Sequence, residues 1–272
     1  WLGSKYDPIL VRTPAGEPWR GVNRYTDREL NLKLNLHKNR IADRRTLLTQ
    51  LDNARSEETA YEQLDHYSRM AADMLLGSPV RDAYDLEKED PKIRHMYGDH
   101  MGGQSLLLAR RLVEAGVPVV QTLLSASDLA GGSGDNWDTH RNHFPKMKDR
   151  LLPVFDRSVS ALLTDLEMRG MLEETLVVFL TDFGRTPKVN GNGGRDHYPN
   201  VYSLAYAGGG IQGGQVYGAS NKKGTEPAAG ACSPADIHAT AFRAMGIDPR
   251  TELHDQLDRP FQLCDGNPLP LF

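Results

Sequence analysis

The sequence predicts an α/β fold with a mainly parallel sheet flanked by helices and with a helical N-terminal arm. Residues 117–124 form a mainly apolar run and residues 176–180 a continuous one, which is the composition of strands buried on both faces. A helical pattern precedes each run, and Gly116 closes the first of these helices. The run VYSLAYAG at 201–208 supplies a third strand after a Gly-rich loop. Helices that alternate with buried strands are typical of parallel sheets.

Two of the predicted helices have clear end signals. The helix at 144–169 is expected to end near Gly170, because glycine accepts the left-handed conformation that closes helices. In the helix that begins PADIHATAFRAMGI, Ser233 is expected as the N-cap, with Asp236 three residues later and Gly246 at the end.

The domain organisation follows from a change in character along the chain. Residues 1–90 are expected to form an irregular arm with peripheral helices at 27–53 and 57–76. Residues 91–272 then carry the alternating helices and strands of the main domain. An upstream segment is also expected, because the chain begins at Trp1 without an initiator Met.

The composition argues against several classes of partner. A formal net charge of −4 gives no general basic field, so no nucleic acid is expected as a partner. The two cysteines are too few for a disulfide framework. Since no run approaches the ~20 apolar residues of a spanning helix, no membrane span is expected either.

Potential metal ligands follow the predicted strands. Asp138 and His140 come after the first strand, Asp182 lies just past the end of the second, and His197 lies in the glycine-rich loop before the third. Because ligands bind beyond the carboxyl ends of parallel strands, these four side chains are expected to face one crevice. This oxygen and nitrogen set suits a divalent metal ion such as zinc or manganese, with calcium as another candidate. Possible additional ligands are Asp135 and Asp196.

Simpler interpretations exist for individual residues. An aspartate after a strand is often a helix cap or a turn residue, and this remains an alternative for Asp182. His143 fits a solvated or capping role better than a ligand role. The predicted site also contains no convincing nucleophile, although three serines lie near it: Ser125, Ser127 and Ser133.

Five motifs, in this order and at these separations, carry a family resemblance: WDTH, TLVVFLTDFGRTP, GRDHYPN, AGGGIQGGQVYGAS and DIHATAFRAMGID. The chain resembles, over about 1–272, the C-terminal portion of an uncharacterised sulfatase-like family of secreted bacterial proteins in the alkaline phosphatase superfamily. The resemblance implies an alkaline phosphatase-like domain, metal ligands at Asp182 and His197, and an exported protein in the periplasm or outside the cell. It also implies hydrolysis of phosphate or sulfate esters, with a small anionic ester or a sulfated glycan as substrate. Arg185 and Arg195 then suit a tetrahedral anion, or pair with a neighbouring carboxylate.

The chain departs from the superfamily pattern in three places. Phe183 stands where a histidine is usual, and Asp138 is only two residues from His140, so Asp135 or Asn136 is an alternative partner for that histidine. The nucleophile-bearing segment would lie upstream of the chain, and it or a separate chain is expected to complete the fold. The leading hypothesis is therefore a metal-dependent ester hydrolase without its nucleophile segment. The alternative is a catalytically inactive, exported binding or scaffold protein, and a phosphosugar mutase or transferase is a third possibility.

Overall fold

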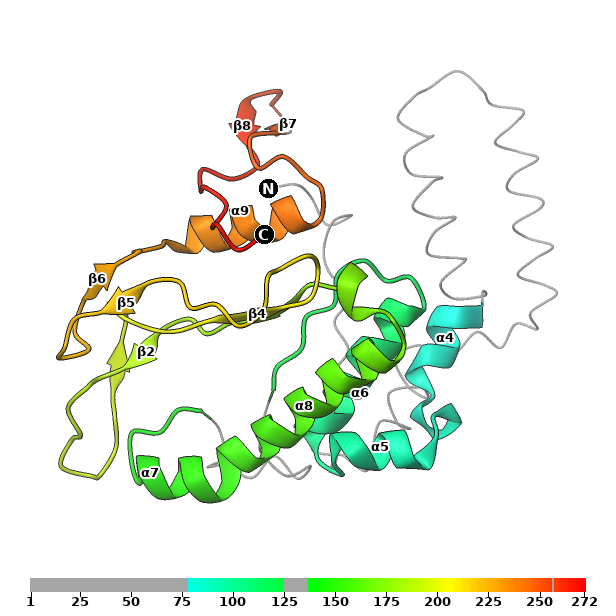
Figure 1. Cartoon of the computed structure of the whole chain (residues 1–272), viewed down its shortest axis with the longest axis horizontal. Helices are drawn as coiled ribbons and strands as arrows, with labels where there is room; N and C mark the ends of the chain where they lie inside the picture. The colour runs from blue at the N-terminus through cyan, green and yellow to red at the C-terminus, as the bar shows by residue number, and fades with distance from the viewer. Residues whose placement is uncertain (1–77, 125–136, 256) are drawn as a thin grey trace. The chain divides into compact units, whose positions relative to one another are not determined.

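The computed structural model describes residues 78–124, 137–255 and 257–272 (Figure 1). The chain divides into two compact units, with the boundary between Gly132 and Ser133. We call them the N-terminal and C-terminal units. Most of the arm predicted for 1–90, with its helices at 27–53 and 57–76, lies outside the described residues.

The described part of the N-terminal unit is helical. Its elements are α4 (Ser78–Tyr84), the 3₁₀ turn η3 (Leu86–Lys88), α5 (Pro91–Tyr97) and α6 (Met101–Glu114). The apolar side chains of Leu86, Tyr97 and Leu107 are fully buried. Beside them lies the buried guanidinium of Arg110, which pairs with the carboxylate of Glu89, as a charge removed from water requires.

The prediction of a strand at 117–124 is wrong. No strand is assigned to this segment, and Val119 and Leu123 are 67% and 82% exposed. Pro118 lies within the run and lacks the N–H that a central strand must donate. Apolar composition alone therefore did not identify a buried strand here, although the helix before it does end at a glycine, since Gly116 has a φ of 91°.

A long helical segment opens the C-terminal unit. It consists of α7 (His143–Lys146), a π-helical turn η4 (Met147–Leu151) and α8 (Leu152–Met168), which confirms the helix predicted at 144–169. Gly170 follows with a φ of 68°, the left-handed closing conformation predicted from the sequence. A short 3₁₀ turn, η5 (Leu172–Glu174), then leads into the first strand.

The described strands form four small antiparallel sheets, each of two strands. The pairs are β1 (Val177–Phe179) with β4 (Ala205–Ala207), β2 (Gly184–Arg185) with β3 (His197–Tyr198), β5 (Ala219–Ser220) with β6 (Pro227–Ala229), and β7 (Glu252–His254) with β8 (Pro260–Gln262). Figure 1 draws the strands as short arrows and α6 and α8 as longer coils.

The predicted α/β class with a mainly parallel, alkaline phosphatase-like sheet is therefore wrong for the described residues. The run at 176–180 does form a strand, but β1 is three residues long and Leu180 after it is 62% exposed. The chain between β1 and β4 contains no helix, whereas parallel strands need a long crossover, usually a helix. The two strands pair antiparallel instead, with Val178 opposite Tyr206.

The last helix, α9 (Pro234–Ala244), has the ends that the sequence predicted. Ser233 and Asp236 form a capping box, and Gly246 has a φ of 72°. The C-terminal segment packs on this helix, where the amide of Leu269 donates to Thr240 Oγ1 at 2.9 Å. Among the described residues, no helix has both the length and the hydropathy that crossing a membrane requires.

Candidate metal centre

Two loops of the C-terminal unit are bonded along their backbones. We call residues 137–143 the histidine loop and residues 190–195 the glycine loop. Arg141 forms an isolated antiparallel bridge with Gly193. The joining hydrogen bonds run from Arg195 N to Thr139 O (3.1 Å), from Asn142 N to Asn192 O (3.2 Å) and from His143 N to Gly193 O (2.9 Å).

The side chain of Asn190 organises the glycine loop. Its Oδ1 accepts the backbone N–H groups of Asn192 and Gly194, each at 2.9 Å. Its Nδ2 donates to the carbonyl oxygen of His140 at 3.1 Å, across the gap between the loops. Short asparagine side chains form such local turns readily, so the run NGNGG is suited to this compact loop.

Aromatic contacts anchor the other end of the histidine loop. The ring of Trp137 meets that of Phe155 on α8 edge-on, with centroids 6.0 Å apart. Phe155 in turn meets Phe179 of β1 at 5.9 Å. Such edge-to-face pairs add to the stabilisation from apolar burial. The loop is therefore held by α8 and β1 as well as by the glycine loop.

The β2–β3 hairpin brings His197 to the histidine loop. In this antiparallel pair Arg185 lies opposite His197. Just beyond the pair, Thr186 N donates to Asp196 O at 2.9 Å, and Thr186 Oγ1 accepts from Asp196 N at 3.1 Å. The sequence separation of 59 residues between Asp138 and His197 is thus closed by a hairpin and not by a parallel sheet.

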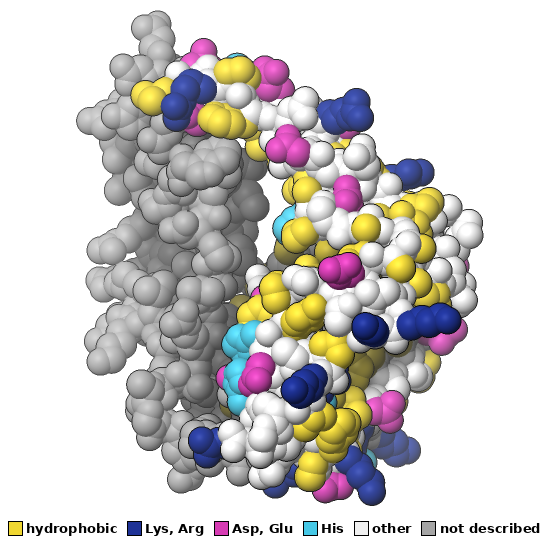
Figure 2. All heavy atoms as spheres, turned by 90° about the vertical axis from the view of Figure 1, so that its left-hand side faces the viewer, with side chains coloured by type: hydrophobic (Ala, Val, Ile, Leu, Met, Phe, Trp, Pro, Cys, Tyr) yellow, Lys and Arg dark blue, Asp and Glu magenta, His cyan; other side chains and the backbone are white. Residues whose placement is uncertain are grey.

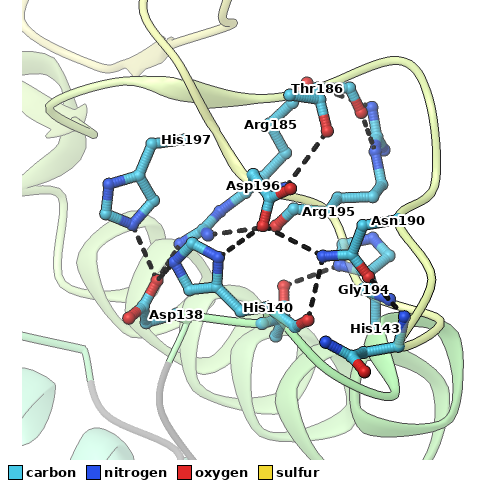
Figure 3. Close-up of polar contacts among 12 residues, drawn as sticks. Asp138, His140, His143, Arg185, Thr186, Asn190, Gly194, Arg195, Asp196 and His197 are labelled. Atoms are coloured by element: carbon cyan, nitrogen blue, oxygen red, sulfur yellow. Dashed lines mark hydrogen bonds and ion pairs between the residues drawn. The ribbon is translucent and has the colours of Figure 1, made fainter.

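Three potential ligands meet where these elements converge (Figure 3). Asp138 Oδ1 lies 3.0 Å from His140 Nε2 and 2.8 Å from His197 Nε2. One ligand atom from each of the three residues lies within 4.8 Å of the other two, and we call this group the Asp-His-His cluster. The side chains are about half exposed, and Figure 2 shows histidine and acidic side chains gathered on one part of the surface.

A second carboxylate, that of Asp196, contacts His140 on the side of its ring that faces away from the cluster. Asp196 Oδ1 lies 2.6 Å from His140 Nδ1, and it also accepts from Asn190 Nδ2 at 3.0 Å (Figure 3). His140 therefore faces a carboxylate at each ring nitrogen. Asp196, which the sequence suggested as a further ligand, contacts the nitrogen of His140 that faces away from the cluster.

Hydrogen bonds keep both carboxylates ionised. The bond with His197, and then the one from Arg185, lower the pKa of the Asp138 carboxyl below its ordinary value. The bonds with His140 and Asn190 lower the pKa of Asp196 in the same way. Hydrogen bonds to the charged form favour that form, so both groups are anionic at neutral pH.

The two predicted anion-binding arginines bond to the backbone in and around the β2–β3 hairpin, and Arg185 also reaches the histidine loop. Arg185 Nη2 donates to Trp137 O at 2.9 Å and to Asp138 Oδ1 at 3.0 Å. Arg195 Nε donates to Thr186 O at 2.6 Å. These bonds give both guanidinium groups a structural role, and anion binding by them stays a prediction.

Asp182 is not a member of the Asp-His-His cluster. Its Oδ1 accepts the backbone N–H of Phe183 at 2.9 Å, which fits the turn alternative. The structure thus brings together three of the four predicted ligands: Asp138, His140 and His197. The other candidates Asp135, Asn136, Ser125, Ser127 and Ser133 lie outside the described residues.

Three features of the site were not predicted from the sequence. Asn190 was not singled out, although an asparagine that opens a glycine-rich run is a typical turn signal. The ring of Phe183 packs on His197 with centroids 4.1 Å apart. His143 is buried, not solvated as predicted, and its Nδ1 lies 2.6 Å from the hydroxyl of Thr139, which satisfies a buried imidazole. Burial, and then the charges of Arg195 and Arg185, lower the pKa of His143.

The chain belongs to the DUF1501 family, described as proteins of unknown function, which it matches over residues 1–270. No curated protein and no solved structure matches it significantly.

Proposed function

We propose that Asp138, His140 and His197 bind a divalent metal ion, and that the protein uses this ion to hydrolyse phosphate or sulfate esters. The observation that carries the proposal is the Asp-His-His cluster, in which three ligand atoms lie within 4.8 Å of one another on a partly exposed surface. Backbone hydrogen bonds between the two loops and the β2–β3 pairing hold the segments that carry these atoms, which supports the proposal.

The donor set favours zinc among the expected metals. Two imidazole nitrogens and one carboxylate oxygen are ligands that zinc binds tetrahedrally. Calcium prefers six to eight oxygen ligands, which this cluster does not offer. Manganese accepts the set less well because it prefers oxygen.

The number of ligands favours a catalytic site over a structural one. Structural zinc sites have four protein ligands, whereas catalytic sites have three and keep one position for water or substrate. The cluster supplies three, from Asp138, His140 and His197. A divalent ion held in this way would activate water as the nucleophile and polarise an ester oxygen. The lack of a convincing serine or threonine nucleophile is therefore compatible with hydrolysis.

The substrate class rests on the motif resemblance to sulfatase-like proteins. Phosphate and sulfate esters carry negative charge, which a metal centre beside cationic Arg185 would attract. A small anionic ester or a sulfated glycan fits the partial exposure of the cluster. The same resemblance supports an exported, periplasmic or extracellular protein.

A metal-binding or scaffold protein without catalysis is the second candidate, and Phe183 favours it. This residue stands where the superfamily has a histidine, and its ring covers one side of His197 at a centroid distance of 4.1 Å. An aromatic ring offers no ligand for a second metal ion. Activity that needs two ions would therefore be lost, while binding of one ion would remain.

Metal analysis combined with turnover tests the proposal. Purified protein is expected to retain about one zinc ion per chain and to hydrolyse 4-nitrophenyl phosphate or sulfate. Asp138→Ala, His140→Ala and His197→Ala are each expected to lose both properties. His254→Ala is the control, because His254 also contacts two carboxylates but belongs to the separate β7–β8 hairpin.

The possible outcomes separate the two candidates. Metal binding that depends on the cluster, without hydrolysis of any ester tested, would support the binding or scaffold protein. Protein that binds no metal, or binds it equally well in the three cluster variants, would refute the metal site.

A further inference from the structure

The ring of His140 lies between two carboxylates, and a chain of hydrogen bonds leads to it from the backbone of the glycine loop (Figure 3). We propose that Asp196 is a positioning residue that fixes the tautomer of His140, so that Nδ1 carries the hydrogen and Nε2 presents its lone pair to a metal ion. This inference rests on the proposed function insofar as it assigns Nε2 to a metal. The hydrogen-bond chain itself does not depend on any metal.

The direction of the first bonds in this chain is fixed by chemistry. The backbone groups of Asn192 and Gly194 are N–H donors, so the atom of Asn190 that they contact must be its carbonyl oxygen. The orientation of the amide is therefore settled, and Nδ2 is the atom that faces Asp196 and the carbonyl oxygen of His140. Both of these groups are acceptors, as an NH₂ group requires.

The next bond fixes the imidazole. An ionised carboxylate only accepts hydrogen bonds, and Asp196 Oδ1 already accepts one from Asn190. The contact of 2.6 Å between Asp196 Oδ1 and His140 Nδ1 therefore requires a hydrogen on Nδ1. A neutral imidazole has one N–H, which leaves Nε2 as the acceptor that a metal needs.

The carboxylate on the other side of the ring, that of Asp138, makes the longer of the two contacts with the imidazole. Asp138 Oδ1 accepts from Arg185 Nη2 at 3.0 Å and lies 2.8 Å from His197 Nε2. The contact with His140 Nε2 is longer, at 3.0 Å, than the contact of Asp196 with Nδ1. Asp138 Oδ1 also accepts from Arg185 Nη2, so this carboxylate keeps a donor when a metal ion takes the Nε2 lone pair of His140.

Other contacts position His197, so Asp196 positions only one of the two histidine ligands, His140. The ring of Phe183 packs on His197, and β3 holds its backbone opposite Arg185 in β2. In known metal sites, an outer carboxylate that accepts the second N–H of a histidine ligand also raises the basicity of that ligand. Loss of such a partner typically weakens metal binding roughly 10- to 100-fold.

The test uses two measurements on wild type, Asp196→Asn and Asp196→Ala. Long-range ¹H–¹⁵N NMR of the metal-free protein, labelled at histidine and kept in alkaline buffer, reports the tautomer of His140, with His140→Gln for assignment. Competition with a chromophoric chelator reports zinc affinity. Asp258→Ala is the matched control, because it removes a carboxylate 2.8 Å from the Nδ1 of His254, outside the site.

We expect wild-type His140 to carry its hydrogen on Nδ1, and Asp196→Ala to shift the hydrogen toward Nε2. Zinc should bind to Asp196→Ala roughly 10- to 100-fold more weakly than to wild type. The loss of affinity should be smaller in Asp196→Asn, which keeps the shape of the side chain. Asp258→Ala should bind zinc with the affinity of wild type. An Nδ1–H tautomer that persists in Asp196→Ala would overturn the proposal, as would unchanged zinc affinity in that variant. Wild-type protein that binds no zinc would defeat the proposed function, while the NMR spectra would still decide whether Asp196 fixes the ring.

Discussion

A Cβ atom built on Gly194 lies only 1.9 Å from the carbonyl oxygen of His140. No real contact of this kind is so short, so the glycine loop approaches the histidine loop more closely than a residue with a side chain permits. The approach allows Asn190 and the backbone of the glycine loop to bond to the loop that carries two of the three proposed ligands. The geometry of the proposed metal centre therefore depends on a residue that contacts no metal.

Gly194→Ala is expected to destabilise the protein and to weaken metal binding together. The added methyl group must push the loops apart, and overpacking of this kind costs about 1–3 kcal/mol. Gly191→Ala is the control in the same loop, because a Cβ there would meet nothing within 4 Å. Its free energy of unfolding should stay within about 0.5 kcal/mol of wild type in urea titrations. Equal effects of the two substitutions would show that the close approach is unimportant.

Asp138→Asn and Asp182→Asn separate a ligand from a turn residue. Asp138→Asn removes the charge between His140 and His197, so metal affinity should fall by more than the roughly 10- to 100-fold cost of losing an outer-shell partner. Asp182→Asn keeps an oxygen that can accept the Phe183 N–H, so it should change stability by at most about 1 kcal/mol and leave affinity unchanged. Zinc titration of both variants checks this. A large loss of affinity in Asp182→Asn would restore Asp182 to the ligand set predicted from the sequence.

The β7–β8 hairpin should make stability depend on pH through His254. Asp258 and then Glu252 hydrogen-bond to this imidazole and raise its pKa in the folded state. Because the pKa of His254 is raised in the folded state, its contacts contribute their full stabilisation below the unfolded-state pKa of about 6.5. This stabilisation is lost as the pH rises through the folded-state pKa. His254→Gln should therefore lower the free energy of unfolding more in acidic than in alkaline buffer. A difference from wild type that is the same at both pH values, or larger in alkaline buffer, would contradict this.

Local features of the fold were predictable from the sequence, and strand pairing was not. Ser233 and Asp236 form the expected capping box, and Gly170 closes the expected helix, because these signals act within one turn of the chain. The prediction of a parallel sheet was wrong because an apolar run does not specify which strand it pairs with. In residues 117–124, Val119 and Leu123 are exposed, and β1 pairs antiparallel with β4.

The candidate site was predicted in part, and for a reason that the structure corrects. Asp138, His140 and His197 were expected at one site because they follow predicted strands, and the structure places their side chains close together. We expected them to meet at the carboxyl edge of a parallel sheet, but the β2–β3 hairpin and the backbone bonds between two loops bring them together. The hydrogen bond from Asn190 to the carbonyl oxygen of His140 could not be foreseen, because it joins residues 50 positions apart in the sequence.

Zinc should raise the melting temperature of the protein, and only through the Asp-His-His cluster. A ligand that binds the folded state alone stabilises it by about 2.7 kcal/mol at a free concentration of about 100 Kd. For a folded unit of this size that corresponds to a rise of roughly 5–10 °C, which a chelator should reverse. His140→Ala and His197→Ala should abolish the rise, whereas His254→Ala should keep it, because His254 lies outside the cluster. Calcium should give little or no rise, since two of the three proposed ligands are imidazole nitrogens. A wild-type melting temperature that is indifferent to zinc, manganese and chelator would count against any stabilising metal, and the cluster would then be a network of hydrogen bonds that holds two loops together.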